Sequence, residues 1–306
     1  MSKLKGVFPV LPTPFDAKGA VDEASLLRLL EFAIESGADG FVYPGMASEV
    51  ETLSPEERKA AVVALGKALR GRIKFVVGAS AADPDEAAAR AREGAEAGAS
   101  AAMIMAPAKA GQDVAAHIAF YAQVAKNCPI PIMLQNAPAP NGAGLKPEAV
   151  VQVALAVPTV RYVKEETLPC GQHVTKILAA AAGKLDGVFG GAGARYLIDE
   201  LVRGAAGTMP AIEMADVHVD IVRAFEKGDT KKARYLYSRT LPLLLFQQTF
   251  RVRMTKTVLQ ARGLVGSNAS RAAGPVPDAG DNVELAALIA EAADLFNRHP
   301  VREAAQ

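Results

Sequence analysis

The sequence predicts a (β/α)8 barrel, or TIM barrel, that is extended by helices at its C-terminus. Short apolar segments alternate eight times with amphipathic segments of helical period before residue 227. Each apolar segment is nearly continuous, which is typical of a parallel strand buried on both faces. The length of 306 residues lies within the range of one α/β barrel. A doubly wound open sheet is the main alternative, but it usually has fewer strands, and no G-x-G-x-x-G motif follows the first strand.

The expected strands are Gly6–Val10, Gly40–Tyr43, Ile73–Gly78, Ala101–Met105, Ile130–Leu134, Val160–Lys164, Gly187–Phe189 and Gly207–Met209. The expected helices are Glu23–Ser36, Pro55–Leu69, Pro84–Ala97, Ala115–Lys126, Pro147–Ala154, His173–Ala182, Ala194–Arg203 and Glu213–Glu226. Their ends carry suitable residues: Ser54 can cap the helix that begins at Pro55, and acidic side chains follow in its first turn. Glycines stand where other helices should end.

The pattern changes after the eighth helix, and we expect a barrel over residues 1–227 and a helical appendix over residues 228–306. Asp229–Gly263 is helical in character and begins at a capping residue. A loop rich in Gly, Pro, Ser and Asn follows at Gly266–Asn282, and a last helix is expected at about Val283–Asn297. We predict that this appendix packs on the barrel and is not a second functional domain.

Composition excludes several classes of function. Lys and Arg (34) nearly balance Asp and Glu (33), so the charge favours neither nucleic acid nor an anionic membrane as a partner. Two cysteines cannot form a disulfide framework, and no targeting segment is visible, so we expect a cytoplasmic protein. The apolar run 241–246 is too short to span a bilayer. The four histidines have no metal-ligand spacing, and we expect no metal and no other cofactor.

The active site of a (β/α)8 barrel lies at the C-terminal ends of its strands, and Lys164 ends the sixth strand. Burial of a lysine favours its neutral amine, which is the form that attacks a carbonyl. We therefore predict that Lys164 is a Schiff-base nucleophile. The alternative is a lysine whose ammonium reaches solvent from the strand end.

Other strand ends supply candidate substrate contacts. The turn Gly45–Ser48 precedes a helical segment, where free N–H groups favour an anion, so Gly45, Ala47 and Ser48 are expected to bind a carboxylate. The alternative is a turn with a solvated serine. Thr13, Gly190 and Met209 follow or end further strands and are also expected to bind substrate. Gly190 lies in a glycine-rich segment that suits either close approach to a ligand or a tight turn without one.

The order and spacing of several motifs resemble the dihydrodipicolinate synthase / N-acetylneuraminate lyase family over about Gly6 to Phe296. These motifs are Pro9–Phe15, Gly45–Glu49 with Leu53–Arg58, Asn136–Pro138 and Tyr162–Glu165. The resemblance implies a (β/α)8 barrel with C-terminal helices that usually assembles as a tetramer, so a homo-oligomer, a tetramer or a dimer, is expected. It also implies a Schiff base between the sixth-strand lysine, here Lys164, and a small 2-oxo acid such as pyruvate.

The sequence departs from the family in its proton relay and in one substrate contact. Many members have a tyrosine where Gln135 stands, so Gln135 is expected to be a catalytic-site residue together with Lys164. Its amide can orient a substrate or a water but cannot act as a general acid or base. The synthase branch has an arginine near Pro140 that binds a second carboxylate, and none is present at Ala139–Gly142. Met46 and Ala47 replace a threonine pair, and the loop after the fourth strand is shorter.

These departures favour a dehydratase or aldolase that acts on a 2-keto-3-deoxy sugar acid. The alternatives are the dihydrodipicolinate synthase reaction and a catalytically silent paralogue that binds a 2-oxo acid. The proton carrier is left open among Ser48, Tyr43, Glu166 and a water held by Gln135. Alternation along the strand predicts that Glu165 points away from Lys164. Glu166 either faces the cavity or is a solvated acid at a helix start, and the sequence favours the second.

Overall fold

A computed structural model describes residues 3–301 and shows the predicted (β/α)8 barrel with C-terminal helices. The chain forms two compact units. One contains Gly6 and Lys74–Met209, and the other contains Val7–Ile73 and the chain from Pro210 onward. The first strand, β1 (Gly6–Val7), lies where the two units divide.

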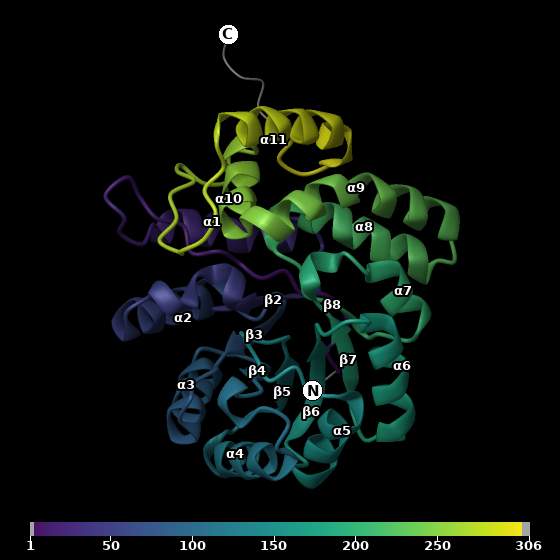
Figure 1. The fold of residues 1–306 in the computed structure, drawn as a ribbon. Helices are drawn as coiled ribbons and strands as arrows, with labels where there is room; N and C mark the ends of the chain where they lie inside the picture. Colours follow the sequence, from purple (N-terminus) through teal and green to yellow (C-terminus); the bar gives the residue numbers. More distant parts are fainter. Residues whose placement is uncertain (1–2, 302–306) are drawn as a thin grey trace. The chain divides into compact units, whose positions relative to one another are not determined.

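In the first unit, parallel strands alternate with helices, and each strand is hydrogen-bonded to the next from β3 to β8. Pairs such as Leu134 with Val163 and Val163 with Val188 set the register of its buried centre. Figure 1 shows the helices of this unit on the outside of the strands. The elements are β3 (Lys74–Gly78), α3 (Pro84–Glu96), β4 (Ala101–Met105), α4 (Val114–Asn127), β5 (Ile132–Asn136), α5 (Pro147–Ala156), β6 (Val160–Glu165), α6 (Cys170–Ala181), β7 (Gly187–Gly190), α7 (Leu197–Val202) and β8 (Gly207–Thr208).

The second unit combines early barrel elements with the C-terminal helices. Val10 forms parallel bridges with both Val42 and Ala211. The antiparallel helices α8 and α9 lie side by side (Figure 1), and α9 also contacts α10 and α11. The elements are α1 (Glu23–Glu35), β2 (Gly40–Tyr43), α2 (Pro55–Leu69), α8 (Ala215–Glu226), α9 (Thr230–Phe250), α10 (Val252–Ala261) and α11 (Ala279–Ala292).

Most predicted elements are confirmed, and the differences at the strands have simple causes. Strands β1 and β8 are shorter than expected because Pro9 and Pro210 have no N–H to donate to a neighbouring strand. Strand β5 begins after Pro131 for the same reason and continues to Asn136. Strand β6 continues through Glu165, one residue past the predicted end at Lys164.

Several helix boundaries also differ from the prediction, and three of these differences have a clear structural cause. Helix α7 begins at Leu197, because the backbone at Ala192–Ala194 has positive φ angles that are incompatible with an α-helix. The segment predicted as helical from Asp229 divides into α9 and α10 at Arg251, which has a φ of 48°. Helix α11 begins before the predicted Val283, because the Asp278 carboxylate caps it by accepting from the N–H of Asp281 at 2.9 Å.

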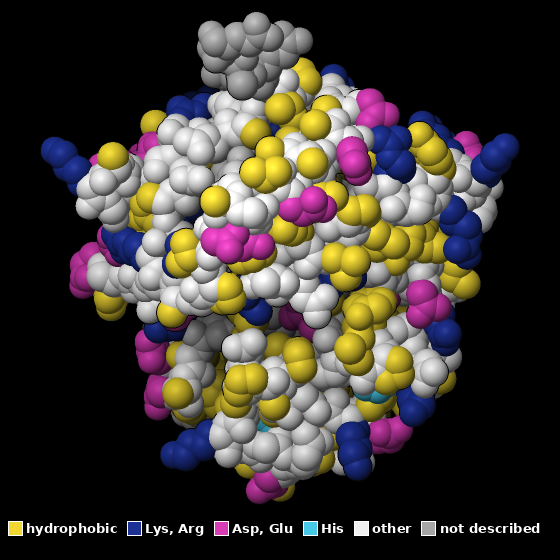
Figure 2. Space-filling model, turned by 45° about the horizontal axis from the view of Figure 1, so that its top comes forward, with side chains coloured by type: hydrophobic (Ala, Val, Ile, Leu, Met, Phe, Trp, Pro, Cys, Tyr) yellow, Lys and Arg dark blue, Asp and Glu magenta, His cyan; other side chains and the backbone are white. Residues whose placement is uncertain are grey.

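The described surface carries charges of both signs. On the face in Figure 2, dark-blue Lys and Arg side chains are interspersed with magenta Asp and Glu side chains. This distribution agrees with the near balance of 34 basic and 33 acidic residues. No helix within residues 3–301 is long and apolar enough to cross a membrane, and that includes α9, which contains the apolar run 241–246.

Candidate active site

Lys164 and Gln135 are neighbours on adjacent strands of the first unit. They occupy paired positions of β6 and β5, and both are buried, with 5% and 2% of their surfaces exposed. Side chains at paired positions of neighbouring strands point to the same face of a sheet. The register therefore places an amine next to an amide in a nearly dry environment.

Glu166 connects these two side chains. Its Oε1 lies 3.2 Å from the Lys164 Nζ and accepts from the N–H of Ala192 at 3.1 Å, and its Oε2 accepts from the Gln135 Nε2 at 2.7 Å. The favoured sequence interpretation of Glu166 as a solvated acid is therefore wrong, because its side chain is only 15% exposed and faces Lys164. Residues i and i+2 of an extended chain share a face, and this spacing was the available signal.

The charge of Glu166 is stabilised by its surroundings. Burial on its own raises the pKa of the Glu166 carboxyl, but the Lys164 ammonium and the donors from Gln135 and Ala192 outweigh this effect, so the pKa lies below its ordinary value. Glu166 is thus a carboxylate at neutral pH. A buried carboxylate beside an amine can accept and return a proton.

Gly191 leaves the space that the Glu166 carboxylate occupies. A Cβ at Gly191 would lie 2.4 Å from the Glu166 Oε1, which is closer than side-chain atoms approach one another. The next residue, Ala192, has a φ of 48° and directs its N–H at the same oxygen. The glycine-rich segment after β7 therefore fits around a carboxylate of the protein itself.

Glu165 points away from Lys164, as predicted. Its carboxylate accepts from the Asn136 Nδ2 at 2.8 Å and from the N–H of Thr167 at 2.7 Å. Asn136 also donates to the carbonyl of Leu145 and accepts from its N–H, so this residue anchors the loop after β5. Burial raises the pKa of Glu165 to about 7 against these hydrogen bonds. Glu165 and Asn136 thus hold the backbone on which Lys164 and Gln135 stand.

Glu200 is a second buried acid that the sequence did not indicate. It belongs to α7, is fully buried, and has no hydrogen-bond partner for either carboxyl oxygen within residues 3–301. A Cβ at Gly190 would lie 1.8 Å from the Glu200 Oε2, so the space beside Gly190 is filled by this carboxyl. Burial raises the pKa of Glu200 to about 8, and the charges of Glu166 and Asp199 act in the same direction.

Met209, predicted to bind substrate at the end of β8, is 2% exposed, and its N–H donates to the carbonyl of Gly190 at 3.0 Å. Its side chain forms part of the core of the first unit. A role for Gly190 or Met209 in contacting substrate stays a prediction.

The remaining predicted residues lie in the second unit, where Thr13, Gly45 and Ser48 belong to one hydrogen-bonded group. The Ser48 hydroxyl donates to the carbonyl of Leu11 at 2.5 Å and accepts from the N–H of Gly45 at 2.8 Å. The Thr13 hydroxyl donates to the carbonyl of Ser48 at 2.6 Å and lies 3.1 Å from the Tyr43 hydroxyl. Ser48 is fully buried, so it is not the solvated serine of the alternative interpretation.

These bonds bear on two of the candidate proton carriers. The hydrogen of the Ser48 hydroxyl is used by Leu11, and that of Thr13 is used by Ser48. Burial raises the pKa of Tyr43 to about 12, which makes its hydroxyl a poor acid at neutral pH. Ala47 is half-buried in the 3₁₀ turn Met46–Ser48. Within residues 3–301, no group of three or more His, Cys, Asp or Glu side chains is arranged to hold a metal ion.

A (β/α)8 barrel with a buried lysine and a carboxylate at the C-terminal ends of its strands has the architecture of a barrel enzyme. A family model places the chain more narrowly. Residues 3–290 match the dihydrodipicolinate synthetase family, and the chain belongs to this family. Its relatives include lyases and synthases, so the protein is an enzyme of this group.

The relatives of this chain are named for two different activities. An L-2-keto-3-deoxyarabonate dehydratase from Azospirillum brasilense is 29% identical over 278 residues, which are 90% of this chain and 89% of that protein. A 4-hydroxy-tetrahydrodipicolinate synthase from Syntrophus aciditrophicus is 31% identical over 252 residues, which are 80% of this chain and 84% of that protein. The crystal structure of a dihydrodipicolinate synthase from Rhodopseudomonas palustris matches with a TM-score of 0.87 and 26% identity, and covers 94% of this chain and 97% of that chain.

Proposed function

We propose that the protein is a Schiff-base dehydratase or aldolase, in which Lys164 attacks the carbonyl of a 2-keto-3-deoxy sugar acid and Glu166 carries protons. The observation behind this proposal is the 3.2 Å contact between the Lys164 Nζ and the Glu166 Oε1 in a buried site. Lys164 must be a neutral amine to attack. The neighbouring carboxylate can take its proton without the help of solvent.

Gln135 supports this assignment by its position. Its side-chain amide donates to the second oxygen of Glu166 at 2.7 Å and so orients the carboxylate. An amide cannot itself carry a proton. We therefore assign proton transfer beside Gln135 to Glu166, the acid that Gln135 orients. Gln135 itself acts as a positioning residue.

Lys164 and Glu166 are sufficient for all the proton transfers of the dehydration. Lys164 gives one proton to Glu166 and attacks the substrate carbonyl, and Glu166 passes that proton to the carbinolamine hydroxyl, which leaves as water. This step gives a protonated imine and restores the Glu166 carboxylate, and the protonated imine acidifies the C–H bonds at C3. The Glu166 carboxylate removes one proton from C3, the C4–O bond breaks, and the proton leaves with the hydroxyl as water. Water then hydrolyses the imine and restores the amine of Lys164. A single carboxylate suffices, because the proton taken from C3 is the proton given to the leaving group.

For the carboxylate of the substrate we propose the turn Gly45–Ser48, in which Ala47 is half-buried, with Thr13 in support. The Ser48 hydroxyl keeps the turn in shape by bonding Gly45 and Leu11. The anion would then bind the backbone N–H of Ala47 near the start of the 3₁₀ turn, because the first amides of a helical turn have no acceptor within it.

The substrate class rests on two further points. One relative is named as an L-2-keto-3-deoxyarabonate dehydratase, and the match covers 90% of this chain and 89% of that protein. Segment Ala139–Gly142 has no arginine to bind a second carboxylate. The alternative is 4-hydroxy-tetrahydrodipicolinate synthesis, which several relatives are named for.

Homo-oligomerisation and a cytoplasmic location stay predictions, and light scattering would test the first.

The test is a substrate panel with matched variants. Purified protein would be assayed with 2-keto-3-deoxy pentonates and hexonates, and with pyruvate plus aspartate semialdehyde. We expect turnover of a keto-deoxy acid, none with Lys164→Ala, and normal folding of that variant by circular dichroism. Turnover confined to pyruvate with aspartate semialdehyde would support the synthase. A protein that binds pyruvate but converts no member of the panel would support the silent paralogue.

A further inference from the structure

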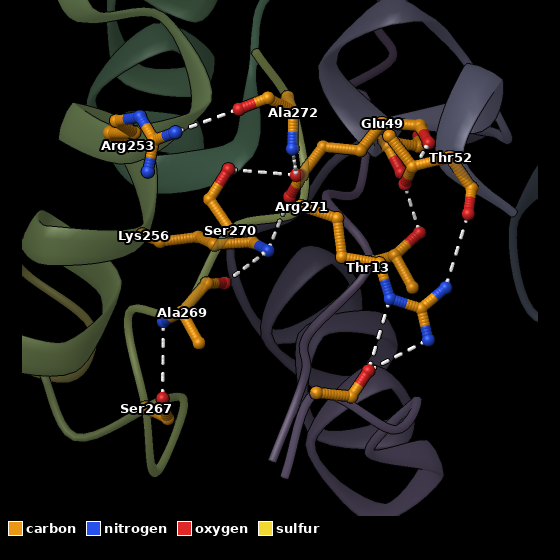
Figure 3. Close-up of polar contacts among 12 residues, drawn as sticks. Thr13, Glu49, Thr52, Arg253, Lys256, Ser267, Ala269, Ser270, Arg271 and Ala272 are labelled. Atoms are coloured by element: carbon orange, nitrogen blue, oxygen red, sulfur yellow. Dashed lines mark hydrogen bonds and ion pairs between the residues drawn. The ribbon is translucent and has the colours of Figure 1, made fainter. Parts of the chain in front are cut away.

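Glu49, the residue after the proposed carboxylate turn, is held by the C-terminal part of the chain. Its carboxylate forms a fully buried ion pair with Lys256 of α10, whose ammonium also donates to the carbonyl of Ala269 at 2.7 Å. The other carboxylate oxygen accepts from the Ser270 hydroxyl at 2.7 Å and from the N–H of Ala272 at 2.6 Å. Figure 3 shows these contacts converging on Glu49.

A second set of contacts fixes the same segment from Arg271. Its guanidinium pairs with both oxygens of Glu57 at 2.7 and 2.8 Å. It also donates to the carbonyl of Thr52 at 3.1 Å, as Figure 3 shows. The Phe15 ring lies 4.2 Å from the Lys256 Nζ and 4.2 Å from the centre of the Arg271 guanidinium. Cations this close to an aromatic ring are attracted by its electrons. Residues 269–272 and the segment after β2 are therefore held together by several independent contacts.

We call the contacts of Glu49 with Lys256, Ser270 and Ala272 the clamp. The backbone conformation of Glu49 indicates what the clamp does. Glu49 has a φ of 58° and a ψ of 36°, a left-handed conformation that is unfavourable for a non-glycine residue. Such a conformation persists only where surrounding contacts impose it. The Glu49 carbonyl accepts from both the N–H and the hydroxyl of Thr52, so the conformation of Glu49 sets the direction in which the chain leaves Ser48.

We propose that Lys256, Ser270 and Ala272 are positioning residues for the turn Gly45–Ser48, so that the C-terminal region sets the affinity of the enzyme for the carboxylate of its substrate. This inference rests on the role proposed above for that turn. It gives part of the helical appendix a function, whereas the sequence predicts only a packed extension. None of these side chains touches substrate, and they act through Glu49.

Two clamp variants and one control test the inference. Lys256→Met with Glu49→Gln removes both charges together and avoids an unpaired buried ion, and Ser270→Ala removes a single hydrogen bond. Arg239→Ala is the control, because Arg239 belongs to α9 and makes an exposed ion pair with Asp294. The first readout is hydrogen exchange of the amides of residues 46–52. The second is the pyruvate concentration that half-saturates borohydride trapping at Lys164.

We expect exchange in residues 46–52 to accelerate about tenfold in the double variant and less in Ser270→Ala, since the double variant removes a charged pair and Ser270→Ala removes one hydrogen bond. Half-saturation should require about tenfold more pyruvate, with the same maximal adduct, and Arg239→Ala should change neither readout. Unchanged exchange, or faster exchange with an unchanged pyruvate requirement, would overturn the inference. A wild-type protein that forms no adduct would instead refute the proposed function, and exchange would still decide whether the clamp holds the turn.

Discussion

The Nζ of Lys164 lies 3.2 Å from the Oε1 of Glu166, and the surrounding residues exclude most solvent from both groups. The carboxylate is also bonded by Gln135 and by the N–H of Ala192. The proposed nucleophile, the proposed proton acceptor and the groups that hold it therefore lie at three successive strand ends, β5, β6 and β7. Single substitutions can test each of these contacts separately.

Glu166→Gln should abolish proton transfer while it preserves the shape of the side chain. We expect kcat to fall about 10²–10⁴-fold, the range of general acid–base catalysis. Pyruvate should still form an imine with Lys164 at a lower rate, because the amine itself is intact. Steady-state kinetics and borohydride trapping measure the two effects. Glu148→Gln, an exposed acid on α5, serves as the control, and activity within threefold of wild type in Glu166→Gln would exclude Glu166 as the proton carrier.

Gly191→Ala should displace the Glu166 carboxylate without unfolding the protein. The added Cβ would meet the Glu166 Oε1 at 2.4 Å, and the end of a flexible side chain can move away. We expect kcat to fall about 10²-fold, with a change in unfolding free energy of about 1 kcal/mol or less. Gly266→Ala is the control, because a Cβ there meets no atom within 4 Å. Full activity in Gly191→Ala would show that the position of Glu166 is unimportant.

Gln135→Leu should move the acidic limb of the pH–rate profile. The hydrogen bond from Gln135 lowers the pKa of Glu166, so its loss raises that pKa. The carboxylate is the active base, and the limb on which activity rises with pH should therefore shift to higher pH. The measurement is kcat/KM over a pH series for both proteins. A limb that stays in place, or moves to lower pH, would contradict the role of Gln135 in orienting and stabilising this carboxylate.

Glu200→Gln should change how stability depends on pH. Burial raises the pKa of Glu200 from 4.5 to about 8, so the folded protein binds this proton more tightly than the unfolded chain. Glu200 therefore lowers wild-type stability as pH rises from about 4.5 to 8, by about 1.4 kcal/mol for each unit of pKa difference. The variant should gain stability relative to wild type across this window. Denaturant unfolding at several pH values measures it, and parallel stability curves would contradict a raised pKa for Glu200.

The sequence predicted the parts of the site that depend on local pattern. Lys164 follows from an apolar strand and the rule for barrel strand ends, and the opposite orientation of Glu165 follows from alternation along the strand. Glu166 was ambiguous, because the same residue can end a strand or begin a helix. The structure shows that β6 continues through Glu165, which leaves Glu166 on the side of Lys164.

Other contacts depend on packing that no local pattern carries. Ala192 donates to Glu166 only because its backbone turns with a positive φ. Glu200 reaches Gly190 from a helix. Lys256 pairs with Glu49 across 207 residues of chain, and nothing near either residue in the sequence indicates the partner.

The most direct test of the Schiff-base assignment is peptide mass spectrometry after borohydride reduction in the presence of pyruvate. Reduction fixes an imine as a stable secondary amine, so the modified residue can be identified. We expect one pyruvate-derived adduct on the peptide that contains Lys164, and none in Lys164→Arg. An unmodified Lys164, or an adduct on a different lysine at equal yield, would contradict it.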